Sequence, residues 1–428
     1  MDGAAERPLV GLFGAFDTGE LGEVALRRVL ELELSRRRPD IALIPLAPFG
    51  AERPTPGDEG RPAQPLPPTA TDPLGVDALI ISGDVLGDDE DWAGRYPAPG
   101  EEMADRGVST LALTGTRGGR AAAPAVTWFA VGPVAESAEV GGLAGKAVWA
   151  RYPATQELLG GTAVQSGDPL LLSGRLFSAD ALRRRADLLR ICGALPTGRR
   201  IVIETAPSLA ASGSGEGLVD AVSAALRADP KLSAVVLRLD PTRRLGDSMT
   251  QMPGLIAERV HQLPAWVGLD DIAAAMSGSA AVVATSPAGA HLAASLGVPV
   301  AVIDTGLGDR FEAAIPVLTG DLLSAIRELL AGKHPVTIDK AIQTLDGAFA
   351  ELAERLPRGA ASPRGAGDAD PVVSALTILQ QRLVDERTAL QAELSRLQSE
   401  LDHLRASPEH RIARPIRDGY RRWQRRRT

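Results

Sequence analysis

Short apolar runs alternate with longer stretches of mixed apolar and polar residues over most of the chain. Such runs are typical of parallel strands that are buried on both faces, and the mixed stretches between them predict amphipathic helices. In the first half, the apolar runs predict strands at residues 9–13, 41–45, 78–82, 109–113 and 127–131. We therefore expect this half to form an α/β domain around a parallel sheet.

The alternation restarts after a predicted helix at residues 179–192. Four further strands are predicted in the segments "RRIVIET", "SAVVLRL", "AAVVAT" and "PVAVID", and a predicted helix at about residues 339–356 closes this second unit. The pattern thus predicts one Rossmann-like domain at residues 1–175 and another at residues 176–356.

Two segments are too rich in proline, glycine and charge to pack into either domain. Residues 50–73, "GAERPTPGDEGRPAQPLPPTATDP", predict a surface insertion in the first domain. Residues 357–371, which begin "PRGAASPRGAGDAD", predict a flexible linker after the second domain.

Leucines recur every seven residues downstream of this linker, at positions 376, 383, 390, 397 and 404. This spacing is typical of a coiled coil, which we place at residues 372–406 and expect to assemble the chain into a homo-oligomer. The alternative is a single amphipathic helix that folds back on the body.

In the basic tail at residues 407–428, arginines surround apolar and aromatic residues. This composition suits contact with an anionic membrane surface as well as simple solvation.

Charge and cysteine content narrow the classes of function. The 428 residues carry a formal net charge of −8, so the overall electrostatic field of the protein does not attract nucleic acid. Cys192 is the single cysteine and the histidines are scattered, which argues against a disulfide or a metal site, and we expect no cofactor. The first residues are not those of a signal peptide and no apolar stretch is long enough to span a membrane. We therefore expect a cytoplasmic protein, with or without contact of its tail at the inner face of the membrane.

The first predicted strand leads into a glycine-rich turn and a helix, "GLFGAFDTGELGEVALRRVL". Its glycines lack the G-x-G-x-x-G spacing, so NAD is not favoured. The turn still allows close approach of a ligand, and the helix start near Gly19, Gly22 and Glu23 offers unpaired N–H groups to an anion. The alternative is a tight turn whose glycines serve geometry only, because Glu20 and Glu23 place negative charge where an anion would bind.

A second turn of this kind lies in "AAVVATSPAGAHLAASLGVPVAVID". An apolar strand leads into a turn shaped by Ser286 and Gly289, and a short helix of small residues follows. His291 falls near the start of this helix, where its imidazole would face a cleft and donate to a phosphate or carboxylate. A packed histidine with a satisfied side chain is the alternative.

The order of four segments resembles that of the polysaccharide pyruvyl transferases. The first turn is similar to the G-x-x-N-x-G-D turn of that family, and "DALIISGDVLGDDEDW" to its strand and glycine-rich loop. The second turn is similar to the family's final turn. In "VWARYPATQELLGG" and "SGDPLLL", the residues that match the family pattern are Arg151, Thr155, Asp168 and Pro169. The resemblance spans about residues 8–312.

This resemblance implies transfer of pyruvate from phosphoenolpyruvate to a sugar unit of a cell-surface polysaccharide. It implies that Arg151 binds the anion and that His291 serves the proton or the phosphate, so these two are the candidate catalytic residues. Arg238 follows a predicted strand of the second domain and is a further candidate partner for an anion. Together, the candidate donor-binding residues are Gly19, Gly22, Glu23, Asp168, Arg238, Ser286 and Gly289.

The second turn also departs from the family, because Ser286, Pro287 and Ala288 stand where pyruvyl transferases carry Arg-Leu-His. It also closely resembles the donor-binding turn of two-Rossmann glycosyltransferases, where a His-x-Ala-Ala helix holds a nucleotide diphosphate, although the segments around Arg151 and Asp168 fit that alternative less well. That alternative implies a nucleotide-sugar donor, and both enzymes imply a glycan or lipid-linked sugar acceptor. A third alternative is a catalytically degenerate scaffold in glycan biosynthesis. All three imply an α/β fold with two Rossmann-like domains facing a central cleft, a GT-B-like arrangement, followed by the α-helical coiled coil.

Overall fold

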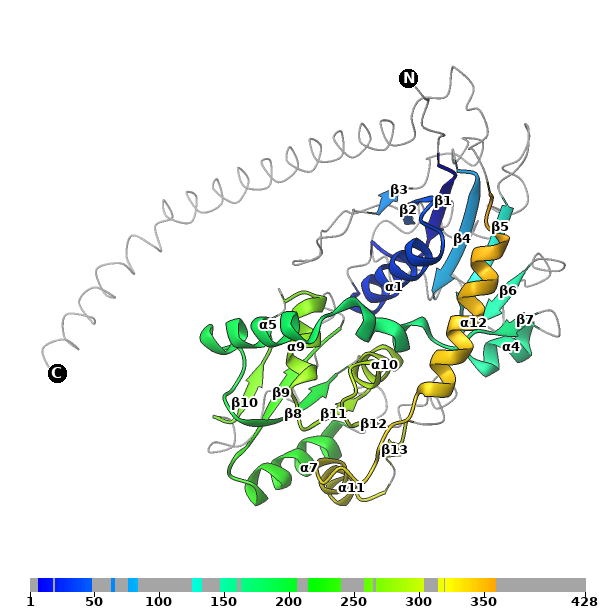
Figure 1. The fold of residues 1–428 in the computed structure, drawn as a ribbon. Helices are drawn as coiled ribbons and strands as arrows, with labels where there is room; N and C mark the ends of the chain where they lie inside the picture. The colour runs from blue at the N-terminus through cyan, green and yellow to red at the C-terminus, as the bar shows by residue number, and fades with distance from the viewer. Residues whose placement is uncertain are drawn as a thin grey trace, which may run out of the picture. The chain divides into compact units, whose positions relative to one another are not determined.

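Two parallel β-sheets with helices packed against them make up the described part of the chain in a computed structural model (Figure 1). The described residues are 7–17, 20–47, 63–65, 76–83, 125–132, 147–159, 163–205, 215–239, 258–264, 267–303, 315–318 and 320–358. The predicted strand at 109–113, the coiled coil, the tail, and most of the insertion and the linker lie outside these residues.

The first sheet has seven strands in the order β3-β2-β1-β4-β5-β6-β7, and the neighbouring strands pair in parallel. The strands are β1 (Leu9–Phe13), β2 (Ala42–Ala47), β3 (Gln64–Pro65), β4 (Ala78–Gly83), β5 (Ala125–Val131), β6 (Val148–Ala150) and β7 (Ala163–Gln165). The predictions at 9–13, 41–45, 78–82 and 127–131 are confirmed as β1, β2, β4 and β5. The other three strands span only two or three residues, too few to give a periodic signal.

The second sheet has six strands in the order β10-β9-β8-β11-β12-β13, again paired in parallel. Its strands are β8 (Arg199–Glu204), β9 (Leu232–Leu237), β10 (Val260–Gln262), β11 (Ala281–Ala284), β12 (Val300–Ile303) and β13 (Val317–Leu318). The four predicted strands are confirmed as β8, β9, β11 and β12. In both sheets the chain builds outwards from a central strand and then crosses to its other side, at β1/β4 and at β8/β11. These are the topological switch points, where α/β sheets bind ligands at the carboxyl ends of their strands.

Helices connect these strands. They are α1 (Leu21–Arg37), α4 (Pro153–Leu159), the 3-10 helix η4 (Pro169–Leu176), α5 (Ala179–Ile191), α7 (Gly215–Ala228), α9 (Leu269–Ser277), α10 (Pro287–Ser295), α11 (Leu322–Leu330) and α12 (Asp339–Arg355). The predicted helices at 179–192 and 339–356 are confirmed as α5 and α12. Within the described ranges, none of these helices combines the length and the hydropathy that crossing a bilayer requires.

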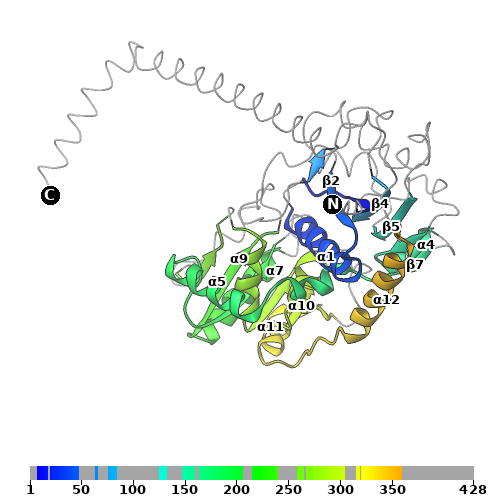
Figure 2. The same ribbon diagram turned by 45° about the horizontal axis from the view of Figure 1, so that its top comes forward.

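Helix α12 packs back against the first half of the molecule, although the sequence interpretation attached it to the second. It contacts α1 and η4, and Phe349 lies 4.7 Å from Phe129 of β5 between ring centroids. Both views show α12 running beside the strands at the β5 to β7 side of the first sheet (Figures 1 and 2). Periodicity predicted that this helix forms, but only packing decides which sheet it covers.

An ion-pair cluster fixes α12 to α1 and η4. Glu33 on α1 is fully buried and pairs with Arg37 and with Arg175, whose Nη1 lies 3.0 Å from Glu33 Oε1. Both arginines also bind Asp346 on α12, at 2.7 Å from Arg37 and 2.8 Å from Arg175. Arg38 extends the cluster by donating to the carbonyl oxygens of residues 353, 356 and 357 at the end of α12.

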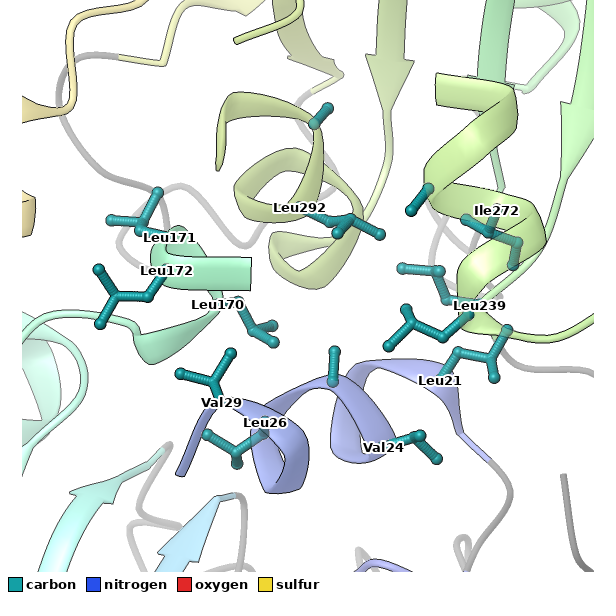
Figure 3. Close-up of a cluster of buried hydrophobic side chains, with 14 of the residues drawn as sticks. Leu21, Val24, Leu26, Val29, Leu170, Leu171, Leu172, Leu239, Ile272 and Leu292 are labelled. Carbon is teal, nitrogen blue, oxygen red and sulfur yellow. The ribbon is translucent and has the colours of Figure 1, made fainter. Parts of the chain in front are cut away.

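A continuous apolar core joins the two sheets. Figure 3 shows side chains of α1, η4, α10 and α9 pointing toward one another, among them Leu21, Leu170, Leu292 and Ile272. Most of α1 is buried, because it packs on its own sheet with one face and on α9 and η4 with others. The two halves are therefore held in one arrangement by burial of apolar surface at about 25 cal/mol per Å².

Candidate functional site

The two glycine-rich turns contact each other at the carboxyl ends of both sheets. The backbone N–H of Leu21, the first residue of α1, donates to the carbonyl oxygen of Leu239 at 2.7 Å. A Cβ added to Gly22 would lie 3.0 Å from the Cβ of Ala288 in the first turn of α10. Glycine at position 22 therefore allows the starts of α1 and α10 to approach closely, and both turns border one site.

The second turn is built on a carboxylate from the neighbouring strand. Glu204, the last residue of β8, accepts hydrogen bonds at Oε2 from the N–H groups of Thr285 at 2.8 Å and Ser286 at 3.0 Å. Its Oε1 lies 3.0 Å from the hydroxyl of Ser286, which in turn accepts from the N–H of Gly289 and caps α10. A Cβ on Gly289 would lie 2.7 Å from Glu204 Cδ, so glycine at this position makes room for the carboxyl group.

Glu204 is unusual among the buried acids of the molecule. It is 1% exposed, and no ion pair joins it to any residue in the described part of the chain. Burial raises the pKa of Glu204 to about 7; the hydrogen bonds from Thr285 and Ser286 oppose this rise, and the negative charge of Glu20 adds to it. The group therefore changes its charge near neutral pH, at the β8/β11 switch point.

A second buried glutamate lies at the switch point of the first sheet. Glu23, in the first turn of α1, is 5% exposed. A Cβ on Gly83, the last residue of β4, would lie 2.8 Å from Glu23 Oε2, and the φ of Gly83 is +83°. A side chain at position 83 would be strained and would displace the glutamate, which explains glycine here.

Three of the sequence-predicted site residues form one buried network. Asp168 Oδ2 lies 2.9 Å from Nε of Arg151 and 2.7 Å from Nδ1 of His291. Asp168 Oδ1 accepts from the N–H of Leu170 and so caps η4. Arg151 follows β6 of the first sheet and His291 lies on α10 of the second, so Asp168 connects the two halves.

The network is closed to solvent in this arrangement. Arg151, Asp168 and His291 are 5%, 1% and 1% exposed. Burial alone would raise the pKa of Asp168. The positive charge of Arg151 and the charge and hydrogen bond of His291 act in the opposite direction and are stronger, so the pKa of Asp168 is lowered. His291 Nε2 is buried and has no hydrogen-bond partner among the described residues. The two predicted catalytic residues are thus joined to each other by a carboxylate.

The remaining predicted residues are distributed around the junction. Arg238 directly follows β9, is partly exposed and precedes the residue that accepts from Leu21. Ser286 and Gly289 shape the α10 turn, whereas Gly19 lies outside the described residues. Sequence reasoning missed Glu204, although an acidic residue at the end of the apolar run "RRIVIET" was a usable signal. Among the described residues, no group of three or more histidine, cysteine or acidic side chains is placed to hold a metal ion.

No protein-family model and no curated protein matches this sequence. Solved structures do resemble the fold. One is from Listeria monocytogenes and is provisionally described as a UDP-N-acetylglucosamine 2-epimerase; it has a TM-score of 0.51 and 15% identity over 82% of this chain and 95% of that chain. Another is the UDP-GlcNAc 2-epimerase of Neisseria meningitidis bound to UDP-GlcNAc, with a TM-score of 0.50 and 12% identity over 81% of this chain and 98% of that chain.

At such identities the likeness concerns the fold and not the activity. It extends over nearly the full length of both solved structures. The described part of this chain therefore has the two-domain, parallel-sheet α/β fold that is found in sugar-nucleotide enzymes of the GT-B-like arrangement.

Proposed function

We propose that this protein is a two-Rossmann enzyme that binds a nucleotide sugar at the junction of the α1 and α10 turns and transfers the sugar to a glycan or lipid-linked acceptor. The observation that carries the proposal is the contact between these turns, Gly22 against Ala288, at the carboxyl ends of two sheets that each have a switch point beside their first strand. Two switch points that face one site suit a ligand with two parts, such as a nucleoside diphosphate joined to a sugar.

The α10 turn supplies the groups for the diphosphate. The positive end of the α10 dipole favours an anion by about 0.3 to 1 kcal/mol, and Pro287 leaves the next N–H, that of Ala288, at the front of the helix. Arg238 directly follows β9, which is separated from β11 by β8, and places a cation at the same edge of the sheet. The ligand of the Neisseria epimerase, UDP-GlcNAc, is a compound of this class.

Pyruvyl transfer from phosphoenolpyruvate is the second candidate. This candidate is supported by the order of the four segments that resemble pyruvyl transferases and by the contacts of Asp168 with Arg151 and His291. It has weaker support, because Arg151 binds a carboxylate of the chain itself and its side chain is 5% exposed. A donor anion would have to replace Asp168 in a buried ion pair, which costs about 3 to 5 kcal/mol.

Calorimetry with a panel of ligands tests these functions. UDP-GlcNAc, GDP-mannose, ADP-glucose and phosphoenolpyruvate are titrated separately into the full chain. We expect saturable binding of at least one nucleotide sugar and none of phosphoenolpyruvate. Binding of phosphoenolpyruvate alone would favour pyruvyl transfer, and binding of no ligand would favour the non-catalytic scaffold.

A substitution that adds a negative charge at the start of α10 tests whether the diphosphate binds there. Ala288→Glu puts a carboxylate in the first turn of this serine-capped helix and should weaken binding of the nucleotide sugar at least tenfold. Ala179→Glu makes the same change in the first turn of α5, which Ser178 caps in the same way, and should leave binding unchanged. Equal effects of the two substitutions would contradict placement of the diphosphate at α10.

A further inference from the structure

We infer that Glu204 lies next to the anion position of the α10 turn and must take up a proton before the diphosphate of a nucleotide sugar binds beside it. The inference rests on the proposed function and adds its regulation: donor binding is coupled to proton uptake. The carboxylate of Glu204 accepts hydrogen bonds from the backbone N–H groups of Thr285 and Ser286 at the switch point of the second sheet.

The geometry accommodates both protonation states of Glu204. When the group is ionised, Oε2 accepts from the two backbone N–H groups and the hydroxyl of Ser286 donates to Oε1. When it is protonated, Oε1 becomes the donor, and the oxygen of Ser286 accepts from it as well as from the N–H of Gly289. The hydroxyl hydrogen of Ser286 then turns from Glu204 to solvent, which this partly exposed residue can reach, so a proton can be added with Glu204 in place.

Among the described residues, no cation forms an ion pair with Glu204. Glu20, the residue directly before α1, carries a charge that acts on Glu204, and that charge is also negative. Of the charged residues at the carboxyl ends of the two sheets, Glu23 lies in the first turn of α1, Arg238 directly follows β9, and His291 on α10 is hydrogen-bonded to Asp168. Burial raises the pKa of Glu204 to about 7, and no ion pair among the described residues opposes this rise by stabilising the ionised carboxylate.

A bound diphosphate adds further negative charge next to Glu204. Coulomb repulsion between the two favours the neutral carboxyl group, so ligand and proton bind together. By linkage, the affinity for the donor should fall about tenfold per pH unit above the pKa of Glu204 and should be constant well below it.

The test uses the full chain and UDP-GlcNAc, or whichever nucleotide sugar of the panel binds, because its diphosphate diester keeps a constant charge over the range tested. Affinity is measured at pH 6.0 and at pH 8.5, and the heat of binding at pH 7 is measured in buffers of different ionisation enthalpy. For the wild-type protein we expect binding about 30-fold weaker at pH 8.5 and uptake of about half a proton at pH 7. Glu204→Gln copies the neutral form and should bind with the same affinity at both pH values and without proton uptake. Glu354→Gln, an exposed glutamate on α12, is the matched control and should behave as the wild type.

The outcomes separate this inference from the proposed function. Binding that is independent of pH, or a pH dependence that survives in Glu204→Gln, would overturn the proton coupling while the nucleotide-sugar function stands. If Glu204→Gln abolished binding at both pH values, the carboxylate would be a direct contact for the ligand, and the inference would again be wrong. Failure of all nucleotide sugars to bind to wild type and to Glu204→Gln at pH 6.0 would overturn both.

Discussion

Asp168 and His291 hydrogen-bond across the two halves of the molecule, 2.7 Å apart between Oδ2 and Nδ1. Asp168 caps the 3-10 helix η4 that follows the first sheet, and His291 lies on the helix at the switch point of the second. The same carboxylate oxygen lies 2.9 Å from Nε of Arg151. One buried acid therefore sets the position of α10, and with it the position of the candidate ligand turn.

Asp168→Asn should strongly destabilise the protein. It removes the carboxylate that pairs with the buried Arg151, a loss of about 3 to 5 kcal/mol in the free energy of unfolding by urea at pH 7. Asp180→Asn removes an exposed ion pair with Arg183 and should cost less than about 1 kcal/mol. A small effect of Asp168→Asn would show that the network does not hold the two halves together.

This contribution should depend on pH in a defined direction. Because the pKa of Asp168 is lower in the folded protein than in the unfolded chain, its stabilisation is present above the unfolded pKa and is lost as pH falls toward the folded one. The difference in stability between wild type and Asp168→Asn should therefore be constant from about pH 8 to 5 and shrink below about pH 4. Urea unfolding at a series of pH values measures it.

Glu204→Gln should stabilise the ligand-free protein at alkaline pH. The pKa of Glu204 rises from 4.5 to about 7 on folding, which corresponds to a penalty of roughly 3 kcal/mol for the ionised group. A raised carboxyl pKa means that stability is fully present below the unfolded pKa and is lost as pH rises through about 7. The variant should thus equal the wild type near pH 4 and exceed it in melting temperature at pH 8.5. A wild-type pH profile in Glu204→Gln would contradict the titration.

Gly174→Ala should loosen the contact between η4 and α10. A Cβ at this position would lie 2.2 Å from the carbonyl oxygen of Ser295, a clash with backbone that we expect to cost about 1 to 3 kcal/mol. Gly347→Ala on α12 is the control, because beyond the chain neighbours and the backbone of its own helix no described atom lies within 4 Å of the added Cβ. That change should raise stability by up to about 1 kcal/mol, as alanine favours helix. Denaturant unfolding of both variants measures the contrast.

The pair Glu33 and Arg175 should be coupled in a double-mutant cycle. Each single substitution to alanine breaks part of the cluster that holds α12, and the buried Glu33 also pairs with Arg37. We expect a coupling energy of about 1 to 3 kcal/mol and faster hydrogen exchange of α12 in each single variant. Additive effects, with protection of α12 unchanged, would show that apolar packing alone holds this helix.

The predicted coiled coil is tested by shortening the chain. A protein that ends at residue 364 lacks the leucine heptads and should sediment as a smaller species than the full chain. Leu390→Pro in the full chain should have the same effect, since proline breaks a helix at a cost of about 3 kcal/mol. An oligomer of unchanged mass in both would assign self-association to the α/β body.

The long central strands could be predicted from the sequence, because strands buried on both faces must be apolar over most of their length. β1, β4, β8 and β11 are of this kind, and the two glycine-rich turns that follow β1 and β11 were recognised with them. Short strands such as β6 and β7 left no periodic signal. The fold class followed from the alternation of apolar runs with amphipathic stretches. The packing of α12 against the first sheet did not, because the sequence of an amphipathic helix does not indicate which sheet it will cover.

The candidate site shows the same division. The sequence by itself determined that Ser286 and Gly289 shape a turn and that Arg151, Asp168 and His291 are notable polar residues. Only the tertiary structure decided that these last three bind one another and that the carboxylate of Glu204 fills the α10 turn. The contacts of Glu204 with Thr285 and of Asp168 with His291 join residues that are 81 and 123 positions apart. Such contacts are set by the packing of two sheets on one core, and local sequence patterns do not encode them.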